Sequence, residues 1–473
     1  MNLTLEYKLM SKKTPSTSRK NSKYVYRFAC AVVFATIAMA LFLSFWRPYV
    51  TDHYLPTDAL LGLGNLAMSA GLYVGIYIII GNWLHAFRIG VERKASILAN
   101  QVLTLLTTDF IGTFVSSAVS GQFRYYFDLL KMYGILFIIQ AVINCILSIP
   151  MTDLYRKLFP PLRILEIHGD YNNNLYDKIN GVYNKYKIID RISVDTDEAE
   201  LRTKFEDYDA VILNDIDAHN RNRLVKLCYE SDIRVYFVPK LSDIIMKSAE
   251  VLNQIDAPLF LNKNNGIGPI KRLVKRIFDI LLSGIALVIF SPIFLVIAFL
   301  IHNEDSGPVF YRQERVTIGG RRFNIIKFRS MIVDAEKDGK PRPASEDDER
   351  ITKIGRFIRK VRIDELPQLI NIIKGDMSIV GPRPERCEHV EKYTKEIPEF
   401  SYRLKMKGGL TGYAQVYGKY NTSPLDKLKL DLCYITNYSL LLDLQIIFET
   451  IKILFQKEKT QGFDEKAINE LRE

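Results

Sequence analysis

Two adjacent carboxylates, Asp364 and Glu365, lie within the basic stretch 359–369. Apolar residues follow them at helical spacing and Gly375 ends the pattern, which predicts a helix with both acids at its N-terminus. An adjacent acid pair suits covalent catalysis combined with the binding of a divalent cation. A simpler alternative is that Asp364 only caps the helix, a common role for aspartate. This motif by itself does not separate the two interpretations.

Basic residues that could bind an anion lie on either side of a Gly-Gly turn. The segments Val309–Val316 and Phe323–Lys327 alternate in polarity around Gly319-Gly320, which predicts a β-hairpin. Closely spaced lysine and arginine beside aromatic residues favour a site for an anionic, partly apolar ligand. The candidate ligand-binding residues here are Arg312, Arg315, Lys327 and Arg329.

A third motif places Arg383 between two prolines, Pro382 and Pro384, directly after Gly381. Such a loop has little conformational freedom, so the guanidinium is held in a preset direction, which suits phosphate recognition. Farther along, Lys405–Gly412 forms a second basic, glycine-rich segment, for which an ordinary turn is the alternative.

The first part of the chain contains four apolar stretches that are long enough to cross a bilayer. They are Phe28–Trp46, Ala59–Asn82, Ala95–Val119 and Leu129–Ile149. A secretory signal peptide has a shorter apolar stretch followed by a cleavage site, so we interpret the first stretch as a retained membrane helix. The third contains Asp109, which we predict to pack inside the helix bundle, with a transport role as the alternative.

Lysine and arginine are unevenly distributed around these four stretches. They are frequent in residues 1–24, between the second and third stretches, and after the fourth, and sparse in the other two loops. The positive-inside rule therefore predicts that the N-terminus and everything after residue 150 lie in the cytosol.

Residues 163–240 alternate short apolar runs with helix-compatible segments, which predicts a parallel, Rossmann-like sheet. The expected strands are Arg163–His168, Tyr186–Ser193, Asp209–Asn214 and Ile233–Lys240, and the clearest helices are Asp197–Phe205 and Arg221–Ser231. The turn after the first strand has only Gly169 where a dinucleotide fingerprint needs three glycines. A regulatory or assembly domain is therefore favoured over a cofactor-binding one.

The apolar stretch Ile277–Ile301 is also long enough to cross a bilayer, yet Ser291-Pro292 lies near its middle. Proline removes a helix hydrogen bond and favours a sharp kink. Basic residues flank both ends, which agrees with a helix that enters the membrane, breaks at Ser291-Pro292 and returns. A kinked fifth span is the alternative. The C-terminal run Leu440–Phe455 is either an interfacial helix or part of a core.

Composition excludes several classes of protein. The chain has 473 residues, 48% of them hydrophobic, and a net charge of +11, so it is too long for one ordinary domain and too apolar to be disordered. Its five cysteines form no CxxC pair, so neither a disulfide scaffold nor a zinc site is indicated. The charge alone admits nucleic acid, membrane surfaces or phosphorylated substrates, but four spans argue against a nucleic-acid binder.

Several of these motifs together resemble those of the bacterial sugar transferases, the polyprenyl-phosphate phosphoglycosyl transferases with a single catalytic membrane helix. The motifs are KFRSM, the Asp-Glu-Leu-Pro-Gln run, GDMSIVGPRP, GLTG and the apolar helix with Ser-Pro. The resemblance covers residues 271–460, and residues 25–260 resemble the extension of the large members. The chain is therefore similar to enzymes that initiate capsule or exopolysaccharide synthesis.

The resemblance implies a role for each matching residue. Asp364 would attack the sugar-bearing phosphate of a UDP-sugar and expel UMP, and polyprenyl phosphate would then take the phospho-sugar from the enzyme. Glu365, with Asp364, would hold Mg²⁺. Gln368 and Arg383 join the substrate-binding set, Pro382 and Pro384 make the loop rigid, and Ser291 with Pro292 breaks the helix. Membrane lipid and a second copy of the chain, giving a homodimer, are the further partners implied.

The sequence thus predicts a membrane protein of the α plus α/β class. We expect a basic arm at 1–24, four transmembrane helices within 25–153, a Rossmann-like cytosolic domain at 160–262, a linker at 263–270, and a catalytic α/β domain at 271–473 with the re-entrant helix 277–301. The expected location is the bacterial inner membrane, with the catalytic domain on the cytosolic face. The alternatives are a non-catalytic membrane scaffold and, resting only on the sheet pattern, an oxidoreductase. The transferred sugar is not indicated.

Overall fold

The structure is a computed structural model that describes residues 16–53, 62–121, 123–169, 175–180, 185–252, 256–262, 266–333, 335, 348–418 and 422–454. The basic arm up to residue 15, the start of the second predicted span, the turn after the first predicted strand and part of the predicted linker lie outside these ranges. The chain divides into two compact units, Met1–Val238 and Pro239–Glu473, which are described separately.

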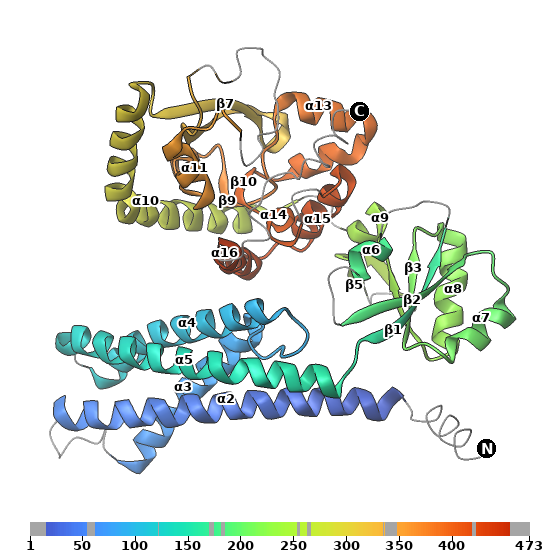
Figure 1. The fold of residues 1–473 in the computed structure, drawn as a ribbon, viewed down its shortest axis with the longest axis horizontal. Helices are drawn as coiled ribbons and strands as arrows, with labels where there is room; N and C mark the ends of the chain where they lie inside the picture. The colour runs from blue at the N-terminus through green and yellow to red at the C-terminus, as the bar shows by residue number, and fades with distance from the viewer. Residues whose placement is uncertain are drawn as a thin grey trace. The chain divides into compact units, whose positions relative to one another are not determined.

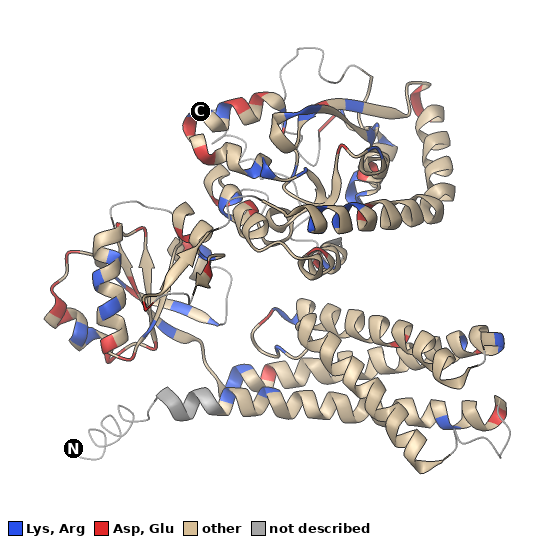
Figure 2. Ribbon diagram, turned by 180° about the vertical axis from the view of Figure 1, so that it is seen from behind, with Lys and Arg blue, Asp and Glu red and all other residues tan. Residues whose placement is uncertain are grey.

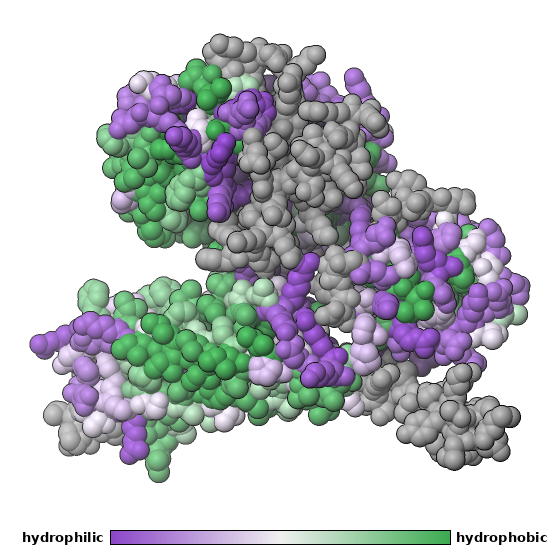
Figure 3. Space-filling view, viewed as in Figure 1, coloured by the Kyte–Doolittle hydropathy of each residue, from purple (hydrophilic) through white to green (hydrophobic). Residues whose placement is uncertain are grey.

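Four long helices begin the first unit and match the four apolar stretches of the sequence (Figure 1). They are α2 (Ser16–His53), α3 (Leu63–Trp83), α4 (Lys94–Ser120) and α5 (Tyr126–Leu158), with a short 3₁₀ turn, η2 (Phe123–Tyr125), before α5. Each is long and apolar enough to cross a membrane. Their outer surface is hydrophobic along its length and hydrophilic at the ends, as expected of helices in a bilayer (Figure 3).

The polar residues of α4 face the neighbouring helices. Asp109 is only 3% exposed, and its Oδ1 accepts a hydrogen bond of 2.7 Å from Tyr73 Oη on α3. Gln101 Oε1 similarly accepts from Tyr77 Oη and from Asn144 Nδ2. Polar groups inside a membrane bundle are stabilising only when other protein groups satisfy them. Asp109 is therefore a buried polar side chain that packs between helices, as the sequence predicts.

This position gives a prediction about stability. Replacement of Asp109 by leucine removes one of the two acceptors of the Tyr73 hydroxyl, which keeps its 2.9 Å hydrogen bond to Gln140 Oε1, so the free energy of unfolding should fall by about 0.5–1.5 kcal/mol. Asparagine keeps an acceptor oxygen and should lose less. Thermal unfolding of the detergent-solubilised protein measures both, with the exposed neighbour Phe110→Leu as control. Equal stability of the leucine and asparagine variants would contradict the expectation.

A four-stranded parallel sheet completes the first unit, with strand order β2-β1-β3-β4. Its strands are β1 (Leu162–His168), β2 (Tyr186–Ser193), β3 (Ala210–Asn214) and β4 (Arg234–Phe237), and its helices are α6 (Leu175–Asn180), α7 (Glu198–Phe205) and α8 (Ala218–Glu230). All five residues of β3 are buried, because the strand is central and covered on both faces. The strands and helices thus follow the predicted alternation closely.

The second unit is a mixed α/β assembly. Its first elements are α9 (Leu241–Met246), the two-stranded pair β5 (Glu250–Leu252) and β6 (Leu259–Leu261), the long helix α10 (Pro269–Asp305), and the hairpin of β7 (Phe310–Val316), η3 (Ile318–Gly320) and β8 (Arg322–Phe328). The hairpin forms around Gly319-Gly320, as the sequence predicts. Because Gly319 and Gly320 have φ of 65° and 79°, the turn favours glycine at both positions.

Short elements follow the hairpin and surround one core. They are α11 (Lys353–Lys360), η4 (Ile363–Glu365), α12 (Gln368–Lys374), β9 (Ser378–Val380), α13 (Cys387–Glu396), η5 (Pro398–Lys405), β10 (Gly409–Thr411), α14 (Tyr413–Tyr417), α15 (Pro424–Thr436) and α16 (Leu440–Leu454). Parallel pairing joins β9 to β10. Helix α16 packs into this core through Ile446, which is fully buried, and Asp443 on the same helix pairs with Lys275. Of the two interpretations of the C-terminal run, core packing therefore holds for its described part.

Helix α10 stays helical through Pro292 but changes direction sharply along its length (Figure 1). Its first half packs on α12 and β9, where Arg276 donates hydrogen bonds to the carbonyls of Ile372 and Ile373. Its second half packs Ile297 and Ile301 against Phe328 of β8. Both halves therefore contact one compact unit, which a straight 37-residue helix of about 55 Å could not readily do.

Candidate active site

The two acids of the sequence motif lie on the 3₁₀ turn η4, directly before α12. The N-cap position of α12 is occupied by Pro367, and no capping hydrogen bond from Asp364 is present. The alternative interpretation of Asp364 as an N-cap is therefore wrong. Helix α12 ends at Gly375, whose φ of 93° favours glycine, in agreement with the predicted end of the helix.

Glu365 forms the centre of a charged cluster. Its Oε1 accepts hydrogen bonds from Lys327 Nζ on β8 at 2.7 Å and from Arg383 Nη2 at 2.8 Å. The Glu365 side chain is only 13% exposed. Burial alone would raise the pKa of Glu365, but Arg383 and Lys327 outweigh it and hold this pKa well below its ordinary value. Glu365 is thus a fixed carboxylate that orients two cations.

Asp364 has the opposite electrostatic environment although it is the adjacent residue. Burial raises the pKa of Asp364, and the charge of Glu365 raises it further, while Lys327 and Arg359 oppose the rise. Two neighbouring carboxylates with pKa values shifted in opposite directions are typical of a site in which one acid reacts and the other supports it.

The loop that carries Arg383 is held by its own backbone. Four consecutive carbonyl oxygens of the loop each accept one hydrogen bond. Backbone N–H groups donate to two of them, Gly409 N to Pro382 O and Val316 N to Glu385 O. Arginine side chains donate to the other two, Arg403 Nη2 to Arg383 O and Arg315 Nη1 to Pro384 O. The sequence predicted a rigid loop from the two prolines alone. The structure adds hydrogen bonds from three other segments. The prolines and these hydrogen bonds therefore both restrict the loop, and with it the direction of the Arg383 side chain.

Arg403 supports the Arg383 loop and was missed by sequence reasoning. It is 2% exposed, and besides contacting Arg383 O at 2.9 Å, its Nε donates to Asp431 Oδ2 at 2.9 Å. Glu385 Oε1, beside it, accepts a 2.7 Å hydrogen bond from Lys427. Burial opposes ionisation of Glu385, but Lys427 and Arg403 lower its pKa to about 2. No local pattern marks Arg403, because its partners lie 20 and 28 residues away along the chain.

Asn371 joins the dyad to the hairpin. Its Oδ1 accepts from Ile326 N at 2.9 Å, and its Nδ2 donates to Asn324 O at 2.9 Å, both on β8. These two bonds fix α12 against the strand that carries Lys327, and so set the separation between Lys327 and Glu365. In the sequence, Asn371 is a polar residue among apolar neighbours, and no local pattern indicates its partners on β8.

The other predicted ligand-binding residues have different surroundings. Arg329 is buried and ion-paired with Asp305, and its Nε donates to Pro308 O at 2.6 Å, so it fixes the end of α10. Arg312 is exposed and pairs in register with Ile326, on the opposite face of the hairpin from Lys327. Gln368 is buried at the start of α12. Arg315 supports the Arg383 loop, and burial together with Arg383 lowers its pKa to about 10.

The oxygen ligands available for a metal ion are few. Among the described residues, no group of three or more His, Cys, Asp or Glu side chains is arranged to hold one. Asp364 and Glu365 provide two adjacent carboxylates, and both ion pairs of Glu365 use Oε1. Mg²⁺ commonly binds one or two carboxylates and completes its shell with water and substrate phosphates. The donor set therefore fits a Mg²⁺ ion that arrives with a phosphorylated ligand.

The fold and the site define a class: an α/β unit on a sharply turned apolar helix, with a carboxylate pair beside Lys327 and Arg383. Residues 270–457 match the bacterial sugar transferases. The exopolysaccharide production protein ExoY of Rhizobium meliloti (strain 1021) is 37% identical over 221 residues, which cover 44% of this chain and 96% of that protein. The chain belongs to the bacterial sugar transferase family.

Two longer relatives are similar over part of their length. The UDP-N-acetylgalactosamine-undecaprenyl-phosphate N-acetylgalactosaminephosphotransferase of Aeromonas hydrophila is 40% identical over 257 residues, 52% of this chain and 59% of the relative. The UDP-glucose:undecaprenyl-phosphate glucose-1-phosphate transferase of Klebsiella pneumoniae is 35% identical over 312 residues, 64% of each. The alignments thus span less than two thirds of these relatives.

Proposed function

We propose that this protein transfers a hexose-1-phosphate from a UDP-sugar to undecaprenyl phosphate, the first membrane step of capsule or exopolysaccharide synthesis. The observation that carries the proposal is the Asp364-Glu365 pair, with opposed pKa shifts, facing Lys327 and Arg383. The names of the relatives support the donor and acceptor classes: one is named for UDP-N-acetylgalactosamine and one for UDP-glucose, and both for undecaprenyl phosphate.

The reaction proceeds in two displacements at Asp364. First, a carboxylate oxygen of Asp364 attacks the phosphorus that carries the sugar, the bond from that phosphorus to the bridging oxygen breaks, and UMP leaves. Then a phosphate oxygen of the acceptor attacks the same phosphorus, which breaks the bond to Asp364 and restores its carboxylate. Arg383, oriented by Glu365 and by its clamped loop, binds the phosphate oxygens as charge moves onto them.

A Mg²⁺ ion would be held by Asp364 and Glu365 in this proposal. When bound, the ion neutralises diphosphate charge and polarises the phosphorus. In this assignment Glu365 has two tasks, because its Oε1 holds Lys327 and Arg383 in place.

In this proposal the chemistry takes place at the membrane surface, where the lipid acceptor is. Helix α10 enters the bilayer and returns at Ser291-Pro292, which keeps the active site on the cytosolic face where a soluble donor and a lipid acceptor can both reach it. Helices α2 to α5 cross the inner membrane as a four-helix bundle, and the Rossmann-like sheet domain serves regulation or assembly, including formation of a homodimer. The apolar exterior of α10, with Val288 74% exposed, supports this arrangement.

A screen of UMP release tests the proposal. The purified full-length protein is incubated with polyprenyl phosphate, Mg²⁺ and each common radiolabelled UDP-sugar in turn, and both UMP and labelled lipid are measured. One donor should give UMP and lipid-linked sugar in equal amounts. If every donor fails while the protein remains folded, the proposal is wrong and a non-catalytic scaffold becomes the better interpretation.

The pH dependence of transfer tests the electrostatics. Lys327 lowers the pKa of Asp364, so Lys327→Met should raise that pKa further. Because a protonated Asp364 is not a nucleophile, the acidic limb of kcat/KM should move to higher pH, with a larger loss of activity at pH 6 than at pH 8. The exposed hairpin variant Arg322→Met is the control and should leave the limb in place. An unshifted limb in Lys327→Met would contradict this assignment.

A further inference from the structure

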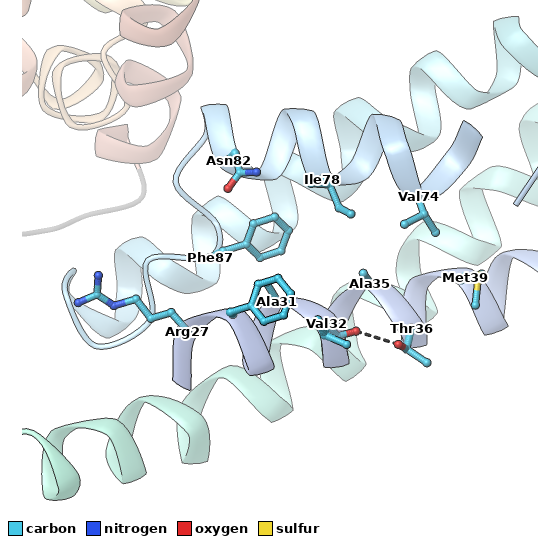
Figure 4. Close-up of a pocket in the computed structure, with 11 residues that line it drawn as sticks. Arg27, Ala31, Val32, Ala35, Thr36, Met39, Val74, Ile78, Asn82 and Phe87 are labelled. Carbon is cyan, nitrogen blue, oxygen red and sulfur yellow. Dashed lines mark hydrogen bonds between the residues drawn. The ribbon is translucent and has the colours of Figure 1, made fainter. Parts of the chain in front are cut away.

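A cavity of about 400 Å³ lies in the first unit between α2 and α3, far along the sequence from the dyad (Figure 4). One wall is the α2 face from Arg27 to Met39, and the other is the α3 face from Val74 to Asn82, with Phe87 closing the end near Arg27. We call this cavity the α2–α3 groove.

The walls of the groove are mostly apolar and open sideways, with Arg27, Thr36 and Asn82 as the polar lining residues. Phe28, Val32 and Ile78 at its rim are 71%, 46% and 40% exposed, whereas Ala35 and Phe87 inside it are nearly buried. The Thr36 hydroxyl is satisfied within its own helix by Val32 O at 2.8 Å. Because the groove offers few hydrogen-bond partners to water, it favours a hydrocarbon chain over water as its occupant.

The end of the groove near Arg27 is positively charged. Arg27 Nη2 donates to Tyr155 Oη at 2.7 Å, and its Nε is buried without a hydrogen-bond partner among the described residues. Burial lowers the pKa of Lys185, and the charges of Arg27 and Arg88 lower it further, so these three cations lie near one another. Basic residues gather at the end of the helices where α2 begins (Figure 2). A phosphate group would satisfy this cluster.

The length of the groove discriminates among lipids. From Arg27 to Met39 is twelve residues of helix, or about 18 Å. Half of a bilayer's hydrocarbon core is about 15 Å. The groove therefore matches an acyl chain that lies in one leaflet, whereas a polyprenyl chain would extend well beyond it. A second copy of this chain would bring its own cationic cluster, which charge repulsion disfavours.

We propose that the α2–α3 groove binds one anionic phospholipid of the cytosolic leaflet, with an acyl chain between α2 and α3 and the phosphate at Arg27, Arg88 and Lys185. Basic pockets between membrane helices on the cytosolic side bind anionic headgroups in this way. The inference rests on the membrane placement of α2 and α3 in the proposed function, but not on the transfer reaction. The bound lipid would join the N-terminal end of α2 to the sheet domain, which contributes Lys185.

Native mass spectrometry of the full-length protein, delipidated in detergent and titrated with single lipids, tests the proposal. Phosphatidylglycerol should bind as one tight adduct, at least 10-fold more tightly than phosphatidylcholine or polyprenyl phosphate. Thr36→Trp fills the groove from an exposed position and should weaken binding at least 10-fold, while Ala40→Trp, exposed on the same helix outside the groove, should not. Arg27→Gln should remove most of the preference for phosphatidylglycerol over phosphatidylcholine.

Three results would overturn the inference. They are tighter binding of polyprenyl phosphate than of phosphatidylglycerol, unchanged binding in Thr36→Trp, and disulfide-linked dimers that form through Val32→Cys in the delipidated protein. Thermal unfolding of each variant shows whether the protein remains folded. Because lipid binding is measured without a sugar donor, failure of this test and failure of the transfer assay are separate outcomes.

Discussion

Replacement of Asp364 by asparagine is expected to reduce UMP release about 10³-fold or more, because it removes the only nucleophile in the proposed reaction. Asparagine has nearly the same shape as aspartate but its amide is a poor nucleophile. The folded protein should not lose stability, since the raised pKa of Asp364 shows that burial disfavours its charge. Thermal unfolding at pH 8 should therefore give a midpoint equal to or above that of the unmodified protein.

A covalent intermediate makes this expectation specific. Incubation of the unmodified protein with a radiolabelled UDP-sugar and no acceptor should label the protein and release one UMP per active site, whereas Asp364→Asn should do neither. Glu388→Gln, an exposed acid of the same unit, should behave as the unmodified protein. Labelling of the asparagine variant at a normal level would show that another residue is the nucleophile.

Replacement of Arg403 by methionine is expected to cause the largest loss of stability, about 3–5 kcal/mol. Arg403 and Asp431 are 2% and 1% exposed and form a 2.7 Å ion pair, so the variant leaves a buried carboxylate without its partner. The loss should exceed that of an exposed substitution such as Lys395→Met, which is expected within about 0.5 kcal/mol. Thermal unfolding of the detergent-solubilised protein measures both.

The pH dependence of this loss has a defined sign. Burial raises the pKa of Asp431, and Arg403 opposes the rise, so the pKa climbs further in Arg403→Met. A carboxyl whose pKa is higher in the folded than in the unfolded state binds an extra proton on folding, and stability then falls as pH rises. The loss should therefore be larger at pH 8 than at pH 5. The double variant Arg403→Met/Asp431→Asn should recover stability; if it does not, the unpaired carboxylate is not the cause.

The two variants also separate chemistry from positioning. Asp364→Asn changes the reacting group itself and leaves the hydrogen bonds of the Arg383 loop in place. Arg403→Met removes the donor to Arg383 O, so the Arg383 loop loses one of its four backbone anchors and transfer should fall even where the protein stays folded. In the double variant, stability should return while transfer stays low, which an effect on folding alone would not produce.

Local patterns in the sequence were sufficient for the elements themselves. The four long helices, the parallel strands β1 to β4 and the hairpin around Gly319-Gly320 agree with the prediction, because hydrophobic periodicity and turn residues act within a few residues of the chain. The dyad and the Pro-Arg-Pro loop were also visible, since each is a short run of unusual residues.

The contacts that the individual basic residues make could not be predicted from the sequence, for a physical reason. Arg312, Arg315, Lys327 and Arg329 are equivalent in the sequence, yet only Lys327 contacts Glu365. Strand alternation turns Arg312 to the other face, Asp305 pairs with Arg329, and Arg315 binds the Arg383 loop. Which cation pairs with which anion depends on segments that are far apart in the chain, so it cannot be predicted from the local sequence.

The sequence alone therefore determined the membrane-helix pattern, the alternating sheet domain and the residues that could react, because these depend on neighbours along the chain. Only the tertiary structure decided that Glu365 orients two cations while the pKa of Asp364 is raised. It also decided that Arg403 and Asn371 hydrogen-bond to the segments that carry the site, and that both halves of α10 pack on one unit. Each of these depends on burial and on pairing between distant residues, which exist only once the chain has folded.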